Sequence, residues 1–252
     1  MHRILTSVAH RPWPLPSGPW IMRQDWCDLL FAHWAVPASV MRALVPRELE
    51  LDLYDGEAYI GVVPFRMDNV RFRGTPKPPG ISAFPELNVR TYVRVGDRPG
   101  VWFFSLDATS RLAVMTARAW FNLPYHHARM SCETRDGSVE YASRRFDHGE
   151  GTPRLRARYR PTGDVELAKT GSLDHWLTER YCLYAQAKNG SLSRGEIQHA
   201  PWALQPAEAE FEHEEYAQAA GVVVPDEAPL LHFVSQIEVV VWPPQPLDAL
   251  SI

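Results

Sequence analysis

The chain has 252 residues, of which 45% are hydrophobic and 22% are charged, as in an ordinary soluble globular protein. Its formal net charge is −4 at pH 7 and no basic stripe dominates, so the sequence predicts no nucleic-acid partner. No apolar stretch reaches the ~18 residues that a membrane-spanning helix needs, so we also predict no membrane partner.

The three cysteines lie far apart, at Cys27, Cys132 and Cys182, and no Cys-x-x-Cys pair is present. This spacing indicates neither a disulfide framework nor a zinc site. The N-terminal residues 1–16 carry His and Arg within a short apolar run, which is a poor signal peptide. We therefore expect a reduced, cytoplasmic protein, and a homo-oligomer remains open.

Alternation of apolar and polar residues recurs along most of the chain and predicts half-buried β-strands. The predicted strands are 25–34, 49–53, 58–67, 89–95, 101–106, 128–134, 139–146, 154–160, 181–186, 191–199 and 232–242. The dipeptides Asp55-Gly56, Asp136-Gly137 and Asn189-Gly190 are typical of tight hairpin turns between such strands.

Helices are predicted only over 38–44, 110–121 and 172–181. With so few short helices among so many strands, the fold class is mainly β (α+β), with small helices at the periphery. We expect a single domain over 1–252, with a core of about 26–242 and an N-terminal extension of 1–20. The Pro- and Gly-containing stretch 73–80 is predicted to be an exposed loop or lid.

Polar side chains interrupt several apolar strands, where burial is costly unless each polar group is paired. Glu86, Asn88 and Arg90 occupy alternate positions of one strand, so their side chains leave the same face. They could bind a small polar ligand, or Glu86 and Arg90 could form a structural ion pair. The other candidate substrate-binding residues are Arg66, Ser105, Asp107, Glu179 and Arg180, of which the last two could also pair with each other.

The sequence Tyr125-His126-His127 suggests a metal site at first sight. Neighbouring residues on a strand face opposite ways and no third ligand stands at a recognised spacing, so we predict no metal. A single His126 or His127 in a pocket would instead carry protons near neutral pH. Gly-x-Ser-x-Gly, Gly-x-Gly-x-x-Gly and Walker motifs are absent, so neither a serine hydrolase nor any cofactor is predicted.

Six segments together resemble the YqjF-like family of uncharacterised bacterial proteins, a domain of unknown function in the acetoacetate decarboxylase-like superfamily. They are residues 31–37 (FAHWAVP), 61–66 (GVVPFR), 84–92 (FPELNVRTY), 100–107 (GVWFFSLD), 123–128 (LPYHHA) and 178–181 (TERY). The similarity extends from about Trp26 to Trp242. It implies a strongly bent antiparallel sheet that forms a cone or barrel, with small helices around it.

The same resemblance argues against acetoacetate decarboxylase activity. That family uses a lysine, made acidic by a second lysine in a Pro-Lys-Lys motif, to form a Schiff base with a β-keto acid. The similar position here is Pro124-Tyr125-His126, which contains neither lysine. The lysines that are present, Lys77, Lys169 and Lys188, fall in predicted exposed loops, where burial cannot lower an amine pKa.

Two functions follow from this pattern. The first is an enzyme that acts on a small carboxylate or keto acid by proton transfer without an imine. Glu86 or His126 would be the general acid or base, and Arg66 or Arg90 would hold the carboxylate. Tyr125 would stabilise an enolate oxygen. The second is a non-catalytic protein that binds or senses a small acidic or aromatic metabolite in the same cavity.

Overall fold

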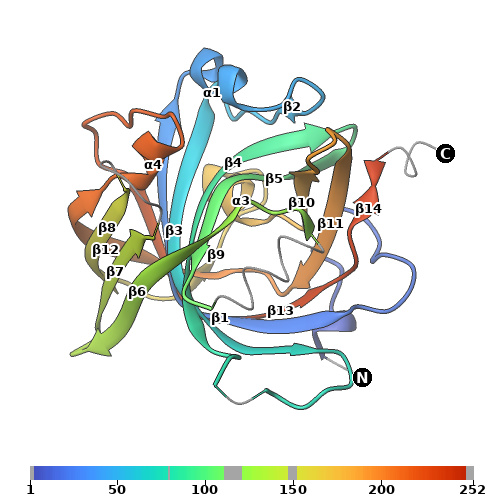
Figure 1. Ribbon diagram of the computed structural model, residues 1–252, viewed down its shortest axis with the longest axis horizontal. Helices are drawn as coiled ribbons and strands as arrows, with labels where there is room; N and C mark the ends of the chain where they lie inside the picture. The colour runs from blue at the N-terminus through green and yellow to red at the C-terminus, as the bar shows by residue number, and fades with distance from the viewer. Residues whose placement is uncertain (1–2, 79, 111–120, 147–151, 248–252) are drawn as a thin grey trace.

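The computed structural model describes residues 3–78, 80–110, 121–146 and 152–247 (Figure 1). Its strands are β1 (Met22–Val36), β2 (Glu50–Leu51), β3 (Ala58–Phe72), β4 (Phe84–Val95), β5 (Arg98–Ala108), β6 (Tyr125–Arg135), β7 (Ser138–Arg145), β8 (Arg154–Pro161), β9 (Glu166–Leu167), β10 (Cys182–Gln186), β11 (Leu192–His199), β12 (Ala203–Glu214), β13 (Leu230–Val241) and β14 (Gln245–Pro246). The helices are η1 (Arg3–Leu5), α1 (Ala38–Leu44), α3 (Leu173–Thr178) and α4 (Tyr216–Ala219).

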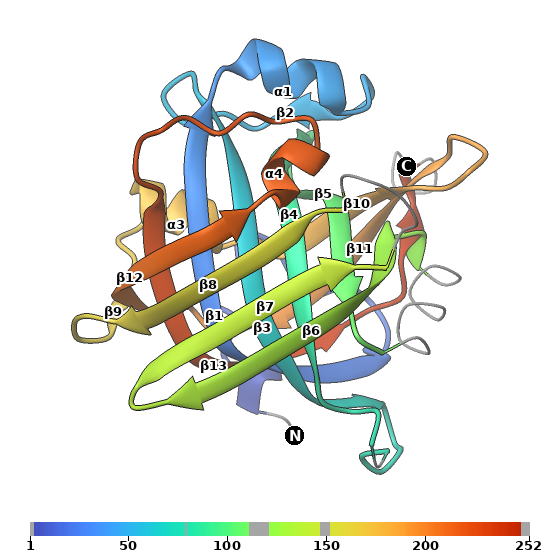
Figure 2. The ribbon, with the colours of Figure 1, turned by 60° about the vertical axis from the view of Figure 1, so that its left-hand side comes forward.

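These strands join into one sheet that closes on itself along two circuits. The first circuit runs β13-β1-β3-β4-β5-β10-β11 and returns to β13. The second leaves β5 through β6, β7, β8 and β12 before it returns to β13. Figure 1 looks into the first circuit, and Figure 2 shows β6, β7, β8 and β12 crossing in front of the shared strands. Each shared strand therefore has one face in each circuit.

The alternation along β4 shows how one strand serves both circuits. Leu87 and Val89 belong to a buried cluster with Tyr141 of β7 and Tyr159 of β8, in the second circuit. The side chains between them point the opposite way, into the first circuit. There a second apolar cluster joins the aromatic residues of β3, β4 and β5.

The structure confirms the mainly β class and the barrel closed by a bent, largely antiparallel sheet. Among the described strand pairs, β5–β6 and β5–β10 are parallel. The Asp136-Gly137 turn joins β6 to β7, and both residues have positive φ, as a tight hairpin turn requires. The prediction of a single domain stays a prediction, which the shared strands support.

The predicted helix 38–44 is α1, and the predicted helix 172–181 is shorter, as α3. Ser172 caps α3 by accepting a hydrogen bond from the His175 amide at 3.3 Å. The predicted helix 110–121 falls mostly on 111–120, outside the described residues. Among the described helices none is long and apolar enough to span a membrane.

Strand β12 was not predicted, although its residues alternate. Successive positions of its outer face are Glu208, Glu210 and Glu212, glutamate has low strand propensity, and Pro206 interrupts the pattern. The structure explains why glutamates occupy this face. They lie beside the arginines of β8 and pair with them, as Glu208 does with Arg160 at 2.5 Å. Opposite charges on neighbouring strands support the pairing of β8 with β12.

Helix α3 closes one end of the first circuit. Trp176 packs against the ring of Tyr92, with 4.7 Å between ring centroids, and against Tyr59 at 5.6 Å. The Tyr92 hydroxyl donates a hydrogen bond to the carbonyl of Leu177 at 2.8 Å. The aromatic floor formed in this way seals the circuit at the end toward which β4 runs.

Candidate functional site

A cavity of about 550 Å³ lies inside the first circuit, a size typical of small-molecule sites. Its apolar walls include Met22, Trp26, Met67, Phe84, Val101, Phe103, Leu106, Phe121, Leu123, Ile197, Trp202 and Val241. The polar side chains Glu86, Asn88, Arg90, Tyr125 and Arg180 also line it. As the alternation predicts, Glu86, Asn88 and Arg90 all face this one space.

Glu86 is the most perturbed acid of the cavity. It is 2% exposed, and the Tyr125 hydroxyl donates to both of its carboxylate oxygens at 3.1 Å. Burial, with a smaller contribution from the charge of Asp107, raises the pKa of Glu86 to about 8, against the opposing effect of the Tyr125 hydrogen bond. Burial, followed by the neighbouring Glu86, raises the pKa of Tyr125 well above its ordinary value. The pair therefore holds a carboxyl group that exchanges its proton near neutral pH.

Arg90 and Arg180 give the opposite end of the cavity a positive charge. Asp52 forms an ion pair with Arg180, whose pKa is lowered by burial despite that partner. Arg90 has no carboxylate partner among the described residues. Its guanidinium lies over the ring of Phe31 at 5.1 Å, and its Nη2 contacts the Tyr92 hydroxyl and the Leu177 carbonyl, both at 3.4 Å. One buried positive charge thus remains without a balancing anion.

Four buried polar atoms on cavity-lining residues lack a hydrogen-bond partner in the described part of the chain. They are Arg90 Nε, Arg180 Nη2, Trp202 Nε1 and Asn88 Oδ1. Their residues are between 2% and 7% exposed, so solvent does not satisfy these atoms. Leaving a buried polar group unpaired costs about 1–3 kcal/mol. Three of the four are donors, which favours an anionic or carbonyl-bearing ligand.

His33 packs behind Arg90 as a neutral ring. Burial, with the nearby charge of Arg90, lowers its pKa well below the ordinary value. The Tyr92 hydroxyl gives its single proton to Leu177, so His33 Nε2 must donate the 2.7 Å bond to that hydroxyl. Gly61 makes room for the ring, since a Cβ there would lie 2.9 Å from His33 Cδ2.

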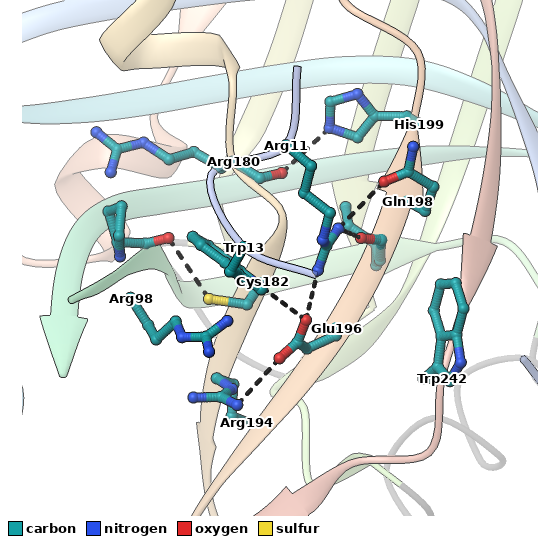
Figure 3. Close-up of polar contacts among 12 residues, drawn as sticks. Arg11, Trp13, Arg98, Arg180, Cys182, Arg194, Glu196, Gln198, His199 and Trp242 are labelled. Atoms are coloured by element: carbon teal, nitrogen blue, oxygen red, sulfur yellow. Dashed lines mark hydrogen bonds and ion pairs between the residues drawn. The ribbon is translucent and has the colours of Figure 1, made fainter. Parts of the chain in front are cut away.

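The N-terminal segment supports this end of the cavity from outside (Figure 3). Ile197 of β11 lines the cavity, while its neighbours Glu196 and Gln198 face the N-terminal segment. Arg11, with a fully buried side chain, pairs with Glu196 and donates to Gln198 Oε1 at 3.2 Å. Trp13 Nε1 also donates to Glu196, at 2.8 Å. The predicted N-terminal extension therefore packs against the barrel wall.

A second layer connects this segment to Arg180. The Arg11 guanidinium lies 5.1 Å from the centre of the Tyr181 ring, which stacks on His199 with 4.5 Å between centroids. His199 Nε2 in turn lies 3.1 Å from the carbonyl oxygen of Arg180, a contact drawn in Figure 3. The backbone that carries the cavity arginine is thus held by packing against the N-terminal segment.

Five of the predicted site residues do not line this cavity. Arg66 pairs with Asp28 at 3.2 Å and is about one-third exposed. Glu179 accepts a bond from the Trp202 amide at 2.9 Å and one from the Tyr181 hydroxyl. Neither of the ion pairs considered from sequence, Glu86 with Arg90 or Glu179 with Arg180, is formed. His126, next to Tyr125 on β6, is half-buried and does not line the cavity. Ser105 and Asp107 are the other two predicted residues that lie outside the cavity lining.

A β-bulge on β5 explains why Ser105 and Asp107 lie outside the cavity. The successive residues Val89 and Arg90 face Ser105 and Phe103, so Phe104 is an extra residue in the ladder. One extra residue exchanges the two faces of a strand. Beyond it, Asp107 points into the second circuit, where Arg145 holds its two oxygens at 2.7 and 2.9 Å.

Sequence reasoning missed several cavity features. Trp202 has no role in the sequence-based predictions, and Trp26 marks only the start of the family similarity. Asp52, the partner of Arg180, stands in a predicted strand without a distinguishing signal. Lys77 lies in the predicted exposed loop, as expected, but that loop lines the cavity mouth. Its exposed ammonium pairs with Asp68 at 2.5 Å.

In the described residues no group of three or more His, Cys, Asp or Glu side chains gathers as it would around a metal ion. His127, the second histidine of the Tyr-His-His sequence, stacks on Phe146 with 4.5 Å between ring centroids. The groups that face the cavity include the carboxyl of Glu86, the phenol of Tyr125 and the guanidinium groups of Arg90 and Arg180.

Comparison with known sequences decides the family. A family described as "Uncharacterized conserved protein", DUF2071, matches residues 23–238. This chain belongs to the DUF2071 family. It is 48% identical over 229 residues to "Uncharacterized protein YqjF" of Bacillus subtilis (strain 168), a match that covers 91% of this chain and 93% of that protein. The resemblance inferred from sequence is confirmed.

Solved structures of proteins from other families share the fold of this DUF2071 protein. The enduracididine biosynthesis enzyme MppR, in complex with the condensation product of pyruvate and imidazole 4-carboxaldehyde, aligns with a TM-score of 0.64 at 12% identity. That alignment covers 94% of this chain and 92% of the other. Acetoacetate decarboxylase from Legionella pneumophila aligns with a TM-score of 0.61 at 13% identity, covering 93% and 91%. The acetoacetate decarboxylase-like architecture is thereby established.

Proposed function

We propose that this DUF2071 protein is an enzyme that moves a proton on a carboxylate or keto acid, with Glu86 as the acid/base and without a lysine imine. One observation carries the proposal. A buried carboxyl group whose pKa is raised to about 8 faces an apolar cavity that also holds an arginine without a carboxylate partner. A general acid/base works best when its pKa lies near the operating pH.

The chemistry assigns each cavity group a task. Ionised Glu86 removes a proton from the carbon beside a substrate carbonyl. The C–H electron pair moves to the carbonyl oxygen and forms an enolate. Once Glu86 carries the proton, the Tyr125 hydroxyl can turn from it and donate to the enolate oxygen. Glu86 trades this proton with solvent and returns a proton to carbon, which completes the exchange, and Arg90 holds the carboxylate of a substrate long enough to reach it.

A lysine imine has little support. Lys169 and Lys188 are exposed and lie outside the cavity lining, and Lys77 is an exposed cation at its mouth. An amine becomes a nucleophile near neutral pH when burial or a neighbouring cation lowers its pKa. Lys77 instead forms an ion pair with the Asp68 carboxylate at the exposed surface.

Keto acids are the first substrates to try, because the solved fold relative MppR was obtained with pyruvate. The protein would be incubated in D₂O with pyruvate, acetoacetate and 8-oxononanoate, a keto acid whose carbonyl and carboxylate stand at opposite ends of the molecule, and loss of the proton signals beside each carbonyl followed by NMR. Exchange above the buffer rate is expected for the wild type and not for Glu86→Gln. The surface variant Glu208→Gln, which also loses one carboxylate, should match the wild type.

Three results would refute the proposal. If Glu86→Gln and the wild type exchange protons equally fast, Glu86 is not the base. If the wild type binds 8-oxononanoate yet leaves its exchange at the buffer rate, the cavity serves binding or sensing. Borohydride treatment with pyruvate provides the test of imine chemistry, since a covalent adduct on a lysine would overturn the mechanism without an imine.

A further inference from the structure

The polar groups of the cavity stand at two separate ends. Glu86 and Arg90 are four residues apart on β4, which pairs with β3 in unbroken register, so their Cα atoms lie ~13 Å apart. The Arg90 guanidinium leans further from Glu86, because its contacts are the Tyr92 hydroxyl and the Leu177 carbonyl. A short acid that touches Arg90 therefore cannot also reach Glu86.

The end near Arg90 is the deeper one. The loop before β4 contributes Thr75 and Lys77 to the cavity lining, and β4 begins at Phe84, beside Glu86. Helix α3 closes the opposite end. A ligand entering past the loop thus meets the carboxyl group first and the arginines last.

The deep end is built to receive one negative charge. Arg90 and Arg180 bring two positive charges, and Asp52 supplies one negative charge among their described partners. Three buried donors there are unpaired: Arg90 Nε, Arg180 Nη2 and Trp202 Nε1. The Trp202 ring meets that of Phe31, which the Arg90 guanidinium covers, at 4.9 Å and that of Trp26 at 6.0 Å, so it reaches from this end toward the middle of the cavity. Carboxylate oxygens accept such bonds, and guanidinium groups hold them in pairs.

Apolar side chains line much of the space between the two ends, together with Asn88. Phe103, Leu106 and Ile197 face it from β5 and β11. The cavity of about 550 Å³ is also much larger than a short keto acid, given the ~30 Å³ that a single water occupies in the liquid. An apolar chain or ring would fill this space and remove both surfaces from water.

We infer that the cavity takes an elongated monocarboxylate with an apolar body. Its carboxylate contacts Arg90 and Arg180 at the deep end, and its body runs past Asn88 to Glu86 and Tyr125. This inference rests on the proposed function for the role of Glu86 and narrows its substrate class. The reacting carbon lies far along the chain from the carboxylate, so short α- and β-keto acids occupy one end at a time.

Binding of butanoate, octanoate and octanamide to the full-length protein at pH 7 tests the inference, by calorimetry or tryptophan fluorescence. Each added methylene should tighten binding about fourfold while it fills the apolar space, so octanoate, with four more methylenes, should bind roughly 250-fold more tightly than butanoate. Octanamide has the same length without the charge. It should bind at least about tenfold more weakly than octanoate.

The variant Arg90→Met keeps the side-chain bulk and removes the charge. It should weaken octanoate binding about tenfold or more and leave octanamide nearly unchanged. Arg94→Met on the same strand is the matched control, because Arg94 contacts the carbonyl of Gly96 and lies outside the cavity lining. If Arg90→Met does not fold, the chain-length and amide comparisons on the wild type decide the question alone.

The inference fails if butanoate binds as tightly as octanoate, if octanamide equals octanoate, or if no carboxylate binds. These failures differ from failure of the proposed function. A protein that prefers octanoate but exchanges protons without Glu86 would refute the proposed function only. One that exchanges pyruvate protons through Glu86 without any length preference would refute the elongated ligand only.

Discussion

The raised pKa of Glu86 makes a prediction about stability that needs no substrate. Replacing Glu86 with Gln keeps the shape of the side chain and removes its titration. The folded pKa of about 8 lies above the ordinary value of 4.5, so the folded chain holds this proton more tightly than the unfolded chain. The stability contribution is therefore complete below about pH 4.5 and is lost as the pH rises to about 8.

The gap between these two pKa values corresponds to about 5 kcal/mol in the free energy of unfolding. About 4 kcal/mol of this falls between about pH 5 and pH 9. Urea unfolding of wild type and Glu86→Gln at those two values measures it. The difference between the two proteins cancels the other titrating groups, and the variant should gain about 4 kcal/mol relative to the wild type as the pH rises.

The exposed variant Glu208→Gln is the control for this measurement and should run parallel to the wild type across the range. A difference between Glu86→Gln and wild type that stays constant with pH would refute the reasoning. It would mean that Glu86 is ionised in the folded protein at neutral pH, and the acid/base proposal would lose its basis. A difference of the opposite sign would mean that the folded state favours the carboxylate.

Three further predictions follow from contacts around the cavity. Tyr125→Phe removes the hydrogen bond that lowers the pKa of Glu86, so that pKa should rise above its wild-type value in a carboxyl ¹³C NMR titration. Arg11→Met removes one of the two arginines that pair with Glu196, the other being Arg194, and should lower the free energy of urea unfolding by about 2 kcal/mol, and an unchanged value would refute the bracing role. Gly100→Ala places a Cβ 2.8 Å from a backbone carbonyl of β10, so the same assay should show a loss of about 1–3 kcal/mol.

Short-range patterns gave the parts of the fold and site that depend on neighbouring residues. The two-residue period of a strand placed Glu86, Asn88 and Arg90 on one face, and the cavity contains all three. The turn at Asp136-Gly137 follows from its two residues alone. Segment 38–44 became a helix with the predicted bounds. In each case the residues that determine the local structure lie within a few positions of one another in the sequence.

The remaining site residues depend on contacts that no local pattern encodes. The bulge at Phe104 reverses the two faces of β5, and a residue count from either end of the strand cannot reveal it. The same uncertainty explains why Asp107 was expected beside a ligand and instead binds Arg145 in the second circuit. Arg180 enters the cavity because α3 closes the barrel, a contact between segments distant in the chain.

Because β4 belongs to both circuits, its alternate residues have different roles, either in the packed core or at the cavity. A polar residue on the core side must be paired, as Asp107 of β5 is by Arg145. On the cavity side Asn88 and Arg90 each keep one buried polar atom without a hydrogen bond. Each such atom lowers the stability of the fold, and the packed core of the second circuit offsets this loss. We therefore expect a bound anion to stabilise the fold as well as occupy the site, because it would satisfy donors that the chain leaves unpaired.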